Sequence, residues 1–539
     1  MAPAQAVGIT SSQVWTTTHN DAAGSVARNA EIVAHNAAAQ TLYVIGGFGS
    51  AEGAGGTRGV DILDAETGAI VETIQVDSST FSSVNSVAVK NGKLAVALAA
   101  TTSQDPGTVL VYDLDAAGRP TGAPVSVAVG ANPDMVTFTP DGSRILVANE
   151  GEPSSDYSSD PVGSVSVIQV SDNSVQTAGF SGLNGQEAAL ESQGARFFSP
   201  DAGEADGDAS VAVDAEPEYI AVSSDGTKAY VTLQENNAIA VVDLTGAAPV
   251  VTEIQPLGFK DHGVAGNGID ASDRDEPGAS NDNVKGNIRT HQNVYGMYQP
   301  DGIAYFSRNG ANYVITANEG DARDYSAFSE EARVDDLDLD TTAFPPAGDP
   351  QDEDNLGRLT VTTTLGDTDS DNFYEELYAF GARSFAIWDV DGTLIFDSGD
   401  LIELLIATEF PDLMPDNRDD NKGGEPESVV VGEIDGRLFA FLGLERYNSI
   451  VSFDITDPML PLFAGLIFFP GDEGPEGLAF ISAADSFDGG SYLAVSSEVS
   501  GTTTLFQVEV PEPASLGLFA LASGGLLTLR RRRRRQRNG

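Results

Sequence analysis

The chain has 539 residues, a formal net charge of −53 at pH 7 and no cysteine. A chain this anionic is repelled by the phosphates of nucleic acids and by anionic lipids, so we expect cations and no nucleic acid among its partners. Without cysteine, it can form neither disulfides nor thiolate metal sites. Its hydrophobic content of 41% suffices for a large core, and an all-β propeller can use such a length as one unit.

The N-terminus lacks the features of an export signal. The first ten residues contain no basic region and no apolar stretch, although Ala4-Gln5-Ala6 resembles the end of a signal peptide. We therefore expect that this start is truncated or misassigned. An upstream reading frame that encodes an apolar stretch would support this expectation, and an in-frame stop codon just upstream would refute it.

A short element recurs along the body of the chain. In each copy, an acidic residue, often after proline, opens an alternating apolar strand, and a turn such as Asp141-Gly142 leads to a second and a third strand. The opening acids are Glu31, Asp134, Glu218, Asp301, Glu427 and Glu476, and Asn85 takes this place in a seventh copy. Glutamates end many of the second strands, namely Glu150, Glu235, Glu319, Glu445 and Glu498.

Seven such copies predict an all-β fold, a seven-bladed β-propeller over residues 7–510. The third to fifth blades carry long loop insertions, at about residues 171–216, 256–299 and 320–383. The last copy has only three strands, so we expect residues 9–18 to supply its fourth strand and to close the circle of blades.

The opening acids are predicted to meet in the central channel, because the first strand of each propeller blade lines that channel. Crowded carboxylates need either a bound cation or raised pKa values. Oxygen ligands suit Ca²⁺ or Mg²⁺ better than zinc, so the opening acids and the strand-end glutamates form a candidate Ca²⁺ site. In the alternative interpretation, these side chains accept backbone N–H bonds and cap turns. Repetition alone does not separate the two.

A second candidate metal site lies in a loop. Asp367, Asp369 and Asp371 alternate as in a calcium loop. Asn372 occupies the place where an EF-hand requires glycine, and Tyr378 occupies the place of the final glutamate, so an EF-hand is excluded. Looser calcium ligation and a solvated acidic loop both remain open.

A few basic residues stand beside the acidic repeat. Arg323, Arg418 and Arg446 could hold a phosphate next to bound cations, or they could pair with carboxylates. Together with Glu319 and Glu445, these arginines form the candidate catalytic set of a metal-dependent phosphoesterase. No Ser-His-Asp pattern is visible in the sequence.

The C-terminal segment, residues 511–537, differs from the body. Pro511-Glu512-Pro513 precedes an uncharged apolar stretch, 514–529, which we predict to be a helix that is barely long enough to cross a membrane. Arginines follow at 530–535 and 537, and the positive-inside rule places them in the cytoplasm and the body on the opposite side. An ordinary tail anchor is the alternative.

Two family resemblances follow from these residues. The C-terminal segment resembles the PEP-CTERM signal that exosortases recognise in Gram-negative bacteria. The residues that carry this resemblance are Pro511, Glu512 and Pro513, the apolar stretch, and the arginines from Arg530 and Arg531 onward. Residues 315–334, 356–389 and 415–458 resemble the choice-of-anchor I family, and this similarity runs through most of residues 7–510. Ser428 departs from the usual Pro-Glu-Gly. The resemblance implies an exported propeller, tethered to the inner membrane and then sorted to the cell envelope or surface.

Two functions are consistent with these features. The first is a calcium-binding surface propeller that contacts other surfaces or a matrix polymer. The alternative is a calcium-dependent phosphoesterase that hydrolyses extracellular phosphate esters, since some members of the family are described as alkaline-phosphatase-like or phytase-like.

Overall fold

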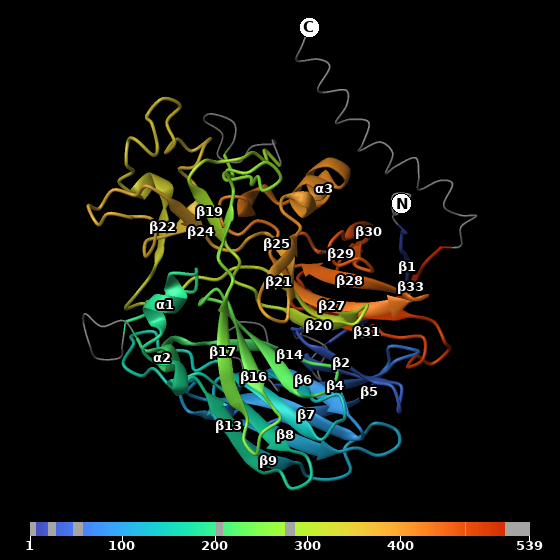
Figure 1. The fold of residues 1–539 in the computed structure, drawn as a ribbon. Coiled ribbons are helices and arrows are strands. Elements are labelled where there is room, and N and C mark those ends of the chain that lie inside the picture. The colour runs from blue at the N-terminus through green and yellow to red at the C-terminus, as the bar shows by residue number, and fades with distance from the viewer. Residues whose placement is uncertain are drawn as a thin grey trace.

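The computed structural model describes residues 7–19, 29–46, 58–200, 209–274, 286–468 and 470–511. These residues form seven four-stranded sheets and one five-stranded sheet (Figure 1). Strands dominate and helices are few and short, as the sequence predicts.

Each four-stranded sheet is antiparallel, and five of them use four strands that are consecutive in the chain. The first sheet contains β2 (Val33–Asn36), β3 (Thr41–Gly46), β4 (Arg58–Asp64) and β5 (Ile70–Val76). The second contains β6 (Phe81–Lys90), β7 (Lys93–Ala100), β8 (Pro106–Asp113) and β9 (Val125–Ala131). The third contains β10 (Pro133–Phe138), β11 (Arg144–Asn149), β12 (Ser164–Gln169) and β13 (Val175–Gly179). The fourth contains β14 (Pro217–Val222), β15 (Lys228–Leu233), β16 (Ala238–Asp243) and β17 (Val250–Pro256).

The remaining three sheets follow the same plan. The fifth contains β20 (Ile303–Arg308), β21 (Ala311–Asn318), β25 (Ser384–Asp389) and β26 (Leu394–Asp397). The sixth contains β27 (Pro426–Ile434), β28 (Arg437–Leu444), β29 (Ser449–Asp454) and β30 (Leu462–Phe468). The seventh contains β31 (Pro475–Ile481), β32 (Tyr492–Ser497), β33 (Thr502–Glu509) and β1 (Thr10–Thr18).

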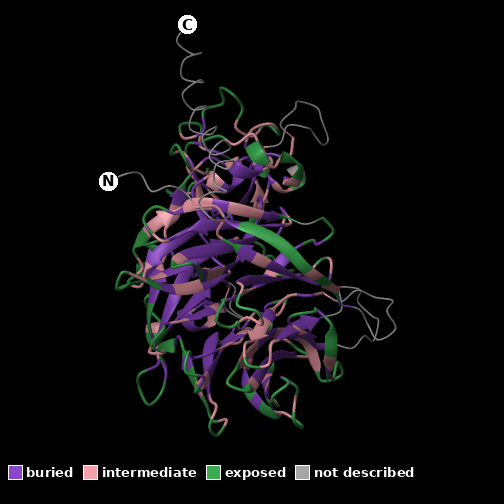
Figure 2. Ribbon diagram, turned by 90° about the vertical axis from the view of Figure 1, so that its right-hand side faces the viewer, coloured by how far each residue is buried: buried purple, intermediate pink, exposed green. Residues whose placement is uncertain are grey.

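The first strands of the seven sheets contact one another in a closed cycle. The order is β2, β6, β10, β14, β20, β27 and β31, and β31 returns to β2. The arrangement is propeller-like, and it gathers the openings of these strands around a common centre. The strands of the sheets are largely buried (Figure 2). The core lies between neighbouring sheets, since Val60 of the first sheet and Val96 of the second, for example, belong to one buried cluster.

The N-terminal strand completes the seventh sheet, as expected. β1 pairs antiparallel with β33, from Thr10 opposite Glu509 to Thr18 opposite Thr502. His19 follows directly and is fully buried. Its Nδ1 lies 2.8 Å from Asp61 Oδ2 on β4, and its Nε2 lies 2.8 Å from Thr503 Oγ1 on β33. This histidine therefore joins the last sheet to the first.

The insertions are more ordered than the predicted loops. The first insertion begins later than residue 171, because residues 175–179 form β13 of the third sheet. It contains the short helices η1 (Ser181–Leu183), α1 (Glu187–Glu191) and α2 (Val211–Asp214). The other two supply the five-stranded sheet, made of β18 (Phe259–Asp261), β19 (Val294–Met297), β24 (Leu377–Ala379), β23 (Thr360–Thr362) and β22 (Glu331–Arg333). The third insertion also contains the short helix η2 (Val334–Asp336). Three further short helices lie between β26 and β27, namely α3 (Leu401–Glu409), η3 (Pro411–Leu413) and η4 (Asp416–Arg418).

The predicted C-terminal helix, 514–529, lies outside the described residues. Within the part of the chain that is described, no helix is long and apolar enough to cross a membrane.

Candidate metal centre in the central cavity

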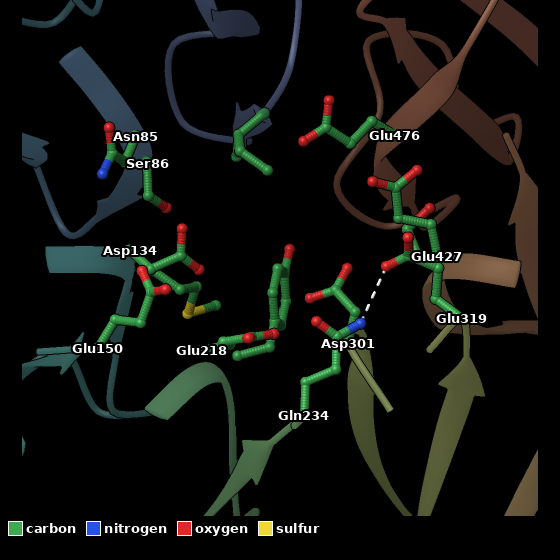
Figure 3. A pocket seen from close by; sticks show the side chains of 14 residues that line it. Asn85, Ser86, Asp134, Glu150, Glu218, Gln234, Asp301, Glu319, Glu427 and Glu476 are labelled. Atoms are coloured by element: carbon green, nitrogen blue, oxygen red, sulfur yellow. Dashed lines mark hydrogen bonds between the residues drawn. The ribbon is translucent and has the colours of Figure 1, made fainter. Parts of the chain in front are cut away.

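A cavity of about 230 Å³ lies where the first strands converge. Seven of its lining residues are acidic: Asp134, Glu150, Glu218, Asp301, Glu319, Glu427 and Glu476. Figure 3 shows their carboxylates gathered around the cavity from different strands. Asn85, the residue in the acidic place of the second sheet, also lines it and donates a hydrogen bond to the Pro133 carbonyl at 3.0 Å.

The Pro-acid openings direct these side chains through β-bulges. The register shifts after Pro133 in β10, after Pro217 in β14, after Pro426 in β27 and after Pro475 in β31. A bulge leaves the extra residue unpaired and re-aims its side chain. At these four openings, the Pro-Asp or Pro-Glu pair is therefore the local signal that directs a carboxylate into the cavity. Asp301, which follows Pro300, lines the cavity without a register shift in β20.

Burial and mutual repulsion raise the pKa values of these carboxyl groups. Burial raises the pKa of Asp134 to about 7. The pKa of Glu427 is raised well above its ordinary value by burial first and then by the neighbouring Glu476 and Glu319. Burial likewise raises the pKa values of Glu150, Glu218, Asp301, Glu319 and Glu476, and nearby carboxylates add to the effect. The cavity therefore favours either protons or bound cations.

Several oxygens in the cavity have the arrangement that a cation needs. One carboxylate oxygen each of Asp301, Glu319 and Glu427 lies within 4.8 Å of the others. Oxygens so spaced can converge on one Ca²⁺ at the usual distance of about 2.3–2.6 Å. Among the described residues, the buried Glu427 Oε2 and Glu476 Oε2 have no hydrogen-bond partner.

The turn-capping interpretation holds for other acids of the repeat. Asp141 accepts the backbone N–H of Ser143 at 2.9 Å, and Asp225 accepts that of Thr227 at 3.0 Å. These aspartates lie in the turns after the first strands, outside the cavity. Turn capping therefore accounts for the acids in the turns and leaves the two unpartnered glutamate oxygens in the cavity unexplained.

A second group of carboxylates adjoins the first through Glu319. Oxygens of Glu319, Glu425 and Glu445 also lie within 4.8 Å of one another. The sequence interpretation missed Glu425, although it directly precedes the Pro426-Glu427 opening. Burial raises the pKa of Glu445 to about 7. Burial alone would also raise the pKa of Glu425, but the nearby Lys422, Arg418 and Arg446 hold it below its ordinary value.

The basic residues of this group are engaged in ion pairs. Arg446 lies 3.0 Å from Glu425 and 2.6 Å from Glu445, and Arg418 pairs with Glu425. Lys422 lies 3.1 Å from Glu319. Arg323 is placed differently: it is 1% exposed and lies 3.3 Å from both Asp214 and Glu216. Pairing with carboxylates, one of the two roles expected for these arginines, is the role seen here.

Four of the carboxylates predicted to lie in the channel do not line the cavity: Glu31, Glu235, Glu445 and Glu498. They lie nearby, because Glu31 and Glu498 contribute to the raised pKa of Glu476, and Glu235 contributes to that of Glu218. Glu498 also accepts a hydrogen bond from Asn29 at 3.0 Å.

The acidic loop at 367–371 is separate from the cavity. Oxygens of Asp367, Asp369 and Asp371 lie within 4.8 Å of one another in a largely exposed position. Asp367 accepts the backbone N–H groups of Asp371 at 3.1 Å and of Asn372 at 2.9 Å. Its carboxylate therefore already caps a turn, and calcium binding there stays a prediction.

Two curated relatives match part of the chain. The "Mesenchyme-specific cell surface glycoprotein" of Strongylocentrotus purpuratus is 29% identical over 309 residues, which are 48% of this chain and 36% of that protein. "Gigasin-3a" of Magallana gigas is 27% identical over 184 residues, which are 28% of this chain and 64% of that protein. The matches thus span less than two thirds of either relative.

Solved structures resemble the chain at low identity. Hydrazine synthase of Kuenenia stuttgartiensis matches with a TM-score of 0.45 and 12% identity, over 90% of this chain and 97% of that one. The WD40 domain of coronin from Toxoplasma gondii matches with a TM-score of 0.44 and 10% identity, over 95% of this chain and 88% of that one.

Family models match both parts of the chain. The choice-of-anchor I domain matches residues 31–458, and the PEP-CTERM protein-sorting motif matches residues 509–534. Of the predicted sorting residues, Glu512, Pro513, Arg530 and Arg531 lie outside the described part, and Pro511 is its last residue. A PEP-CTERM motif is recognised by exosortase-type sorting enzymes and implies export to the cell envelope or surface of a Gram-negative bacterium. The chain is therefore an exported, surface-sorted member of the choice-of-anchor I domain family.

Proposed function

We propose that this protein is a seven-bladed surface propeller that binds Ca²⁺ in its central cavity and acts in surface binding or in the extracellular matrix. The proposal rests on one observation: carboxylates from different sheets meet in the cavity, and two of their buried oxygens, Glu427 Oε2 and Glu476 Oε2, have no partner among the described residues. The name of the relative from Strongylocentrotus purpuratus, a cell surface glycoprotein, agrees with a role at a surface.

Ca²⁺ suits this cavity better than Mg²⁺ does. Ca²⁺ accepts six to eight oxygen ligands in flexible geometry, whereas Mg²⁺ demands a near-ideal octahedron and gives up its water reluctantly. The donors in the cavity are side-chain oxygens on several different strands, such as Asp301 before β20 and Glu427 in β27. A bound ion would offset the repulsion among the carboxylates and hold the fifth and sixth sheets together.

Thermal unfolding of the full chain tests the proposal. We expect the melting temperature to rise with added Ca²⁺ and to fall with a chelator, because an ion that binds only the folded state stabilises it. Glu427→Gln should abolish most of this rise. Glu253→Gln removes the same charge from an exposed position on β17 and should keep the rise. Equal rises in both variants would place the ion elsewhere.

A second candidate function is a metal-dependent phosphoesterase. The observation that favours it is the position of Lys422 and Arg446 beside the Glu319, Glu425 and Glu445 carboxylates. Cations beside a metal can bind the oxygens of a phosphate ester, and a metal can activate the water that releases the alcohol and phosphate.

Hydrolysis assays separate the two functions. If the protein is an esterase, calcium-dependent turnover of a chromogenic phosphomonoester or phosphodiester should be abolished by a chelator. It should also be abolished by Glu319→Gln or Glu445→Gln in a protein that still folds. Calcium-dependent stability without turnover of either substrate would leave the surface-binding function as the better account.

A further inference from the structure

The five-stranded sheet carries aromatic rings on the face opposite its buried side. Along β19, Val294 and Gly296 are buried and Tyr295 between them is partly exposed. β24 repeats this alternation, with Leu377 and Ala379 buried and Tyr378 partly exposed. The buried side packs onto its own hydrophobic cluster, which includes Val294 and Leu377. The other face is therefore the one that a partner can reach.

The aromatic residues lie side by side across three adjacent strands. Tyr295 is opposite Tyr378 in the parallel pair β19–β24, with ring centroids 5.2 Å apart and planes inclined by 23°. Phe259 of β18 meets Tyr378 edge to face, with centroids 4.7 Å apart. We call these three residues the aromatic patch. Aromatic rings offer a large, rigid contact area to a partner at low entropic cost.

Carboxylates lie at the margin of the aromatic patch. Asp261 is exposed and lies directly opposite Tyr295 in the antiparallel pair β18–β19. Glu376 accepts a hydrogen bond from the Tyr378 hydroxyl at 2.7 Å. The whole chain carries a net charge of −53, so an anionic polymer would be repelled. A positively charged partner would be attracted by the carboxylates of Asp261 and Glu376 and by the faces of the aromatic rings.

We propose that the aromatic patch binds a polysaccharide built from amino sugars. The apolar face of a pyranose ring stacks on an aromatic ring, and the free amino groups of a polymer that is not N-acetylated can carry positive charge. Neighbouring rings on adjacent strands would receive successive sugar units, and Asp261 and Glu376 would pair with their ammonium groups. This binding surface is separate from the central cavity and does not depend on a bound cation.

A short glucosamine oligosaccharide, titrated calorimetrically into the full-length protein, tests this inference. Because an anionic protein attracts polycations non-specifically, the deciding comparison is between variants of equal charge. Tyr295→Ala should weaken binding about tenfold, the scale of a lost aromatic anchor. Phe468→Ala removes a ring that is 46% exposed on another sheet and should leave binding unchanged.

Two further sets of measurements test which kind of oligosaccharide binds and whether the variants fold. Asp261→Asn should weaken binding of the glucosamine oligosaccharide, and an uncharged glucose oligosaccharide of the same length should bind less tightly. Equal loss in Tyr295→Ala and Phe468→Ala, or no binding by the correctly folded wild type, would overturn the proposal. Equal affinity for the uncharged oligosaccharide would overturn the assignment of an amino-sugar polymer. Unfolding curves of Tyr295→Ala and Tyr295→Phe identify any loss that comes from misfolding.

Discussion

Lys422 Nζ lies 3.1 Å from Glu319 Oε1 at the edge of the cavity. Glu319 belongs to both groups of candidate metal ligands, the one with Asp301 and Glu427 and the one with Glu425 and Glu445. The same ammonium lies 3.3 Å from Asp321. Burial alone would lower the pKa of Lys422, but the nearby carboxylates of Glu319 and Asp321 raise it above its ordinary value, so the side chain stays charged. This side chain partly neutralises the acidic cluster and competes with any cation that approaches Glu319.

Lys422→Met should therefore lower the stability of the calcium-free protein and enlarge the stabilisation that calcium brings. In chelator, we expect the free energy of unfolding to fall by about 2 kcal/mol or more, because Glu319 loses its partner. In calcium, we expect a larger stabilisation than in the wild type, because the competing ammonium is gone. Urea unfolding in both conditions measures the two effects. Lys93→Met, which removes the partner of the exposed Asp113, serves as the control. A calcium response no larger than that of the wild type would contradict this role.

The stability of the calcium-free protein should depend on pH in a defined direction. The pKa values of Asp134 and Glu445 are raised from 3.8 and 4.5 to about 7 in the folded state. The folded state therefore holds protons more tightly than the unfolded state, and stability falls as pH rises from about 4 through about 7. Calcium should restore stability at pH 8, where these groups are ionised. Urea unfolding from pH 5 to pH 8 measures this slope, and Asp134→Asn should flatten it. A rise in stability over this range would contradict the account.

His19→Ala should weaken the closure between the first and last sheets. The substitution removes buried bonds to Asp61 and Thr503 and leaves the Asp61 carboxylate with one partner fewer. We expect a loss of about 2–3 kcal/mol in the free energy of unfolding. Thr18→Ala changes an exposed neighbour and should cost much less. Comparable losses for the two variants would show that the His19 bonds contribute little.

Arg323→Met should destabilise the fold whether or not calcium is present. The substitution leaves the buried Asp214 and Glu216 without their guanidinium partner, at a cost of about 3–5 kcal/mol. Adding Glu216→Gln should recover part of this loss, because one uncompensated charge disappears. Chemical denaturation of the single and double variants measures both steps. A stable single variant that has lost phosphoesterase activity would instead assign Arg323 to catalysis.

Much of the propeller-like arrangement and its cavity could be predicted from the sequence. The Pro-acid openings mark the bulges at Pro133, Pro217, Pro426 and Pro475, because a local motif determines a local backbone shape. The missing fourth strand of the last copy pointed to the N-terminal strand β1.

The remaining features depend on contacts between distant residues. The five-stranded sheet consists of strands of three or four residues, too short for an alternating pattern to be recognised. Its parallel pair joins Tyr295 to Tyr378 across a long insertion. Glu425 joins the candidate site because Arg418 and Arg446 converge on it, and Arg196 pairs with Glu330 from another insertion. No local pattern predicts such pairs.

Calorimetric titration of Ca²⁺ into the chelator-treated full chain at pH 8 tests the central claim most directly. We expect saturable binding in the wild type and in Glu253→Gln. In Glu427→Gln and Glu476→Gln, which alter the glutamates with unpartnered oxygens, the affinity should fall by about tenfold or more, because even the loss of an outer-shell partner typically costs a metal site about 10–100-fold. Wild-type affinity in both cavity variants, or no binding by the folded wild type, would contradict a calcium site in the central cavity.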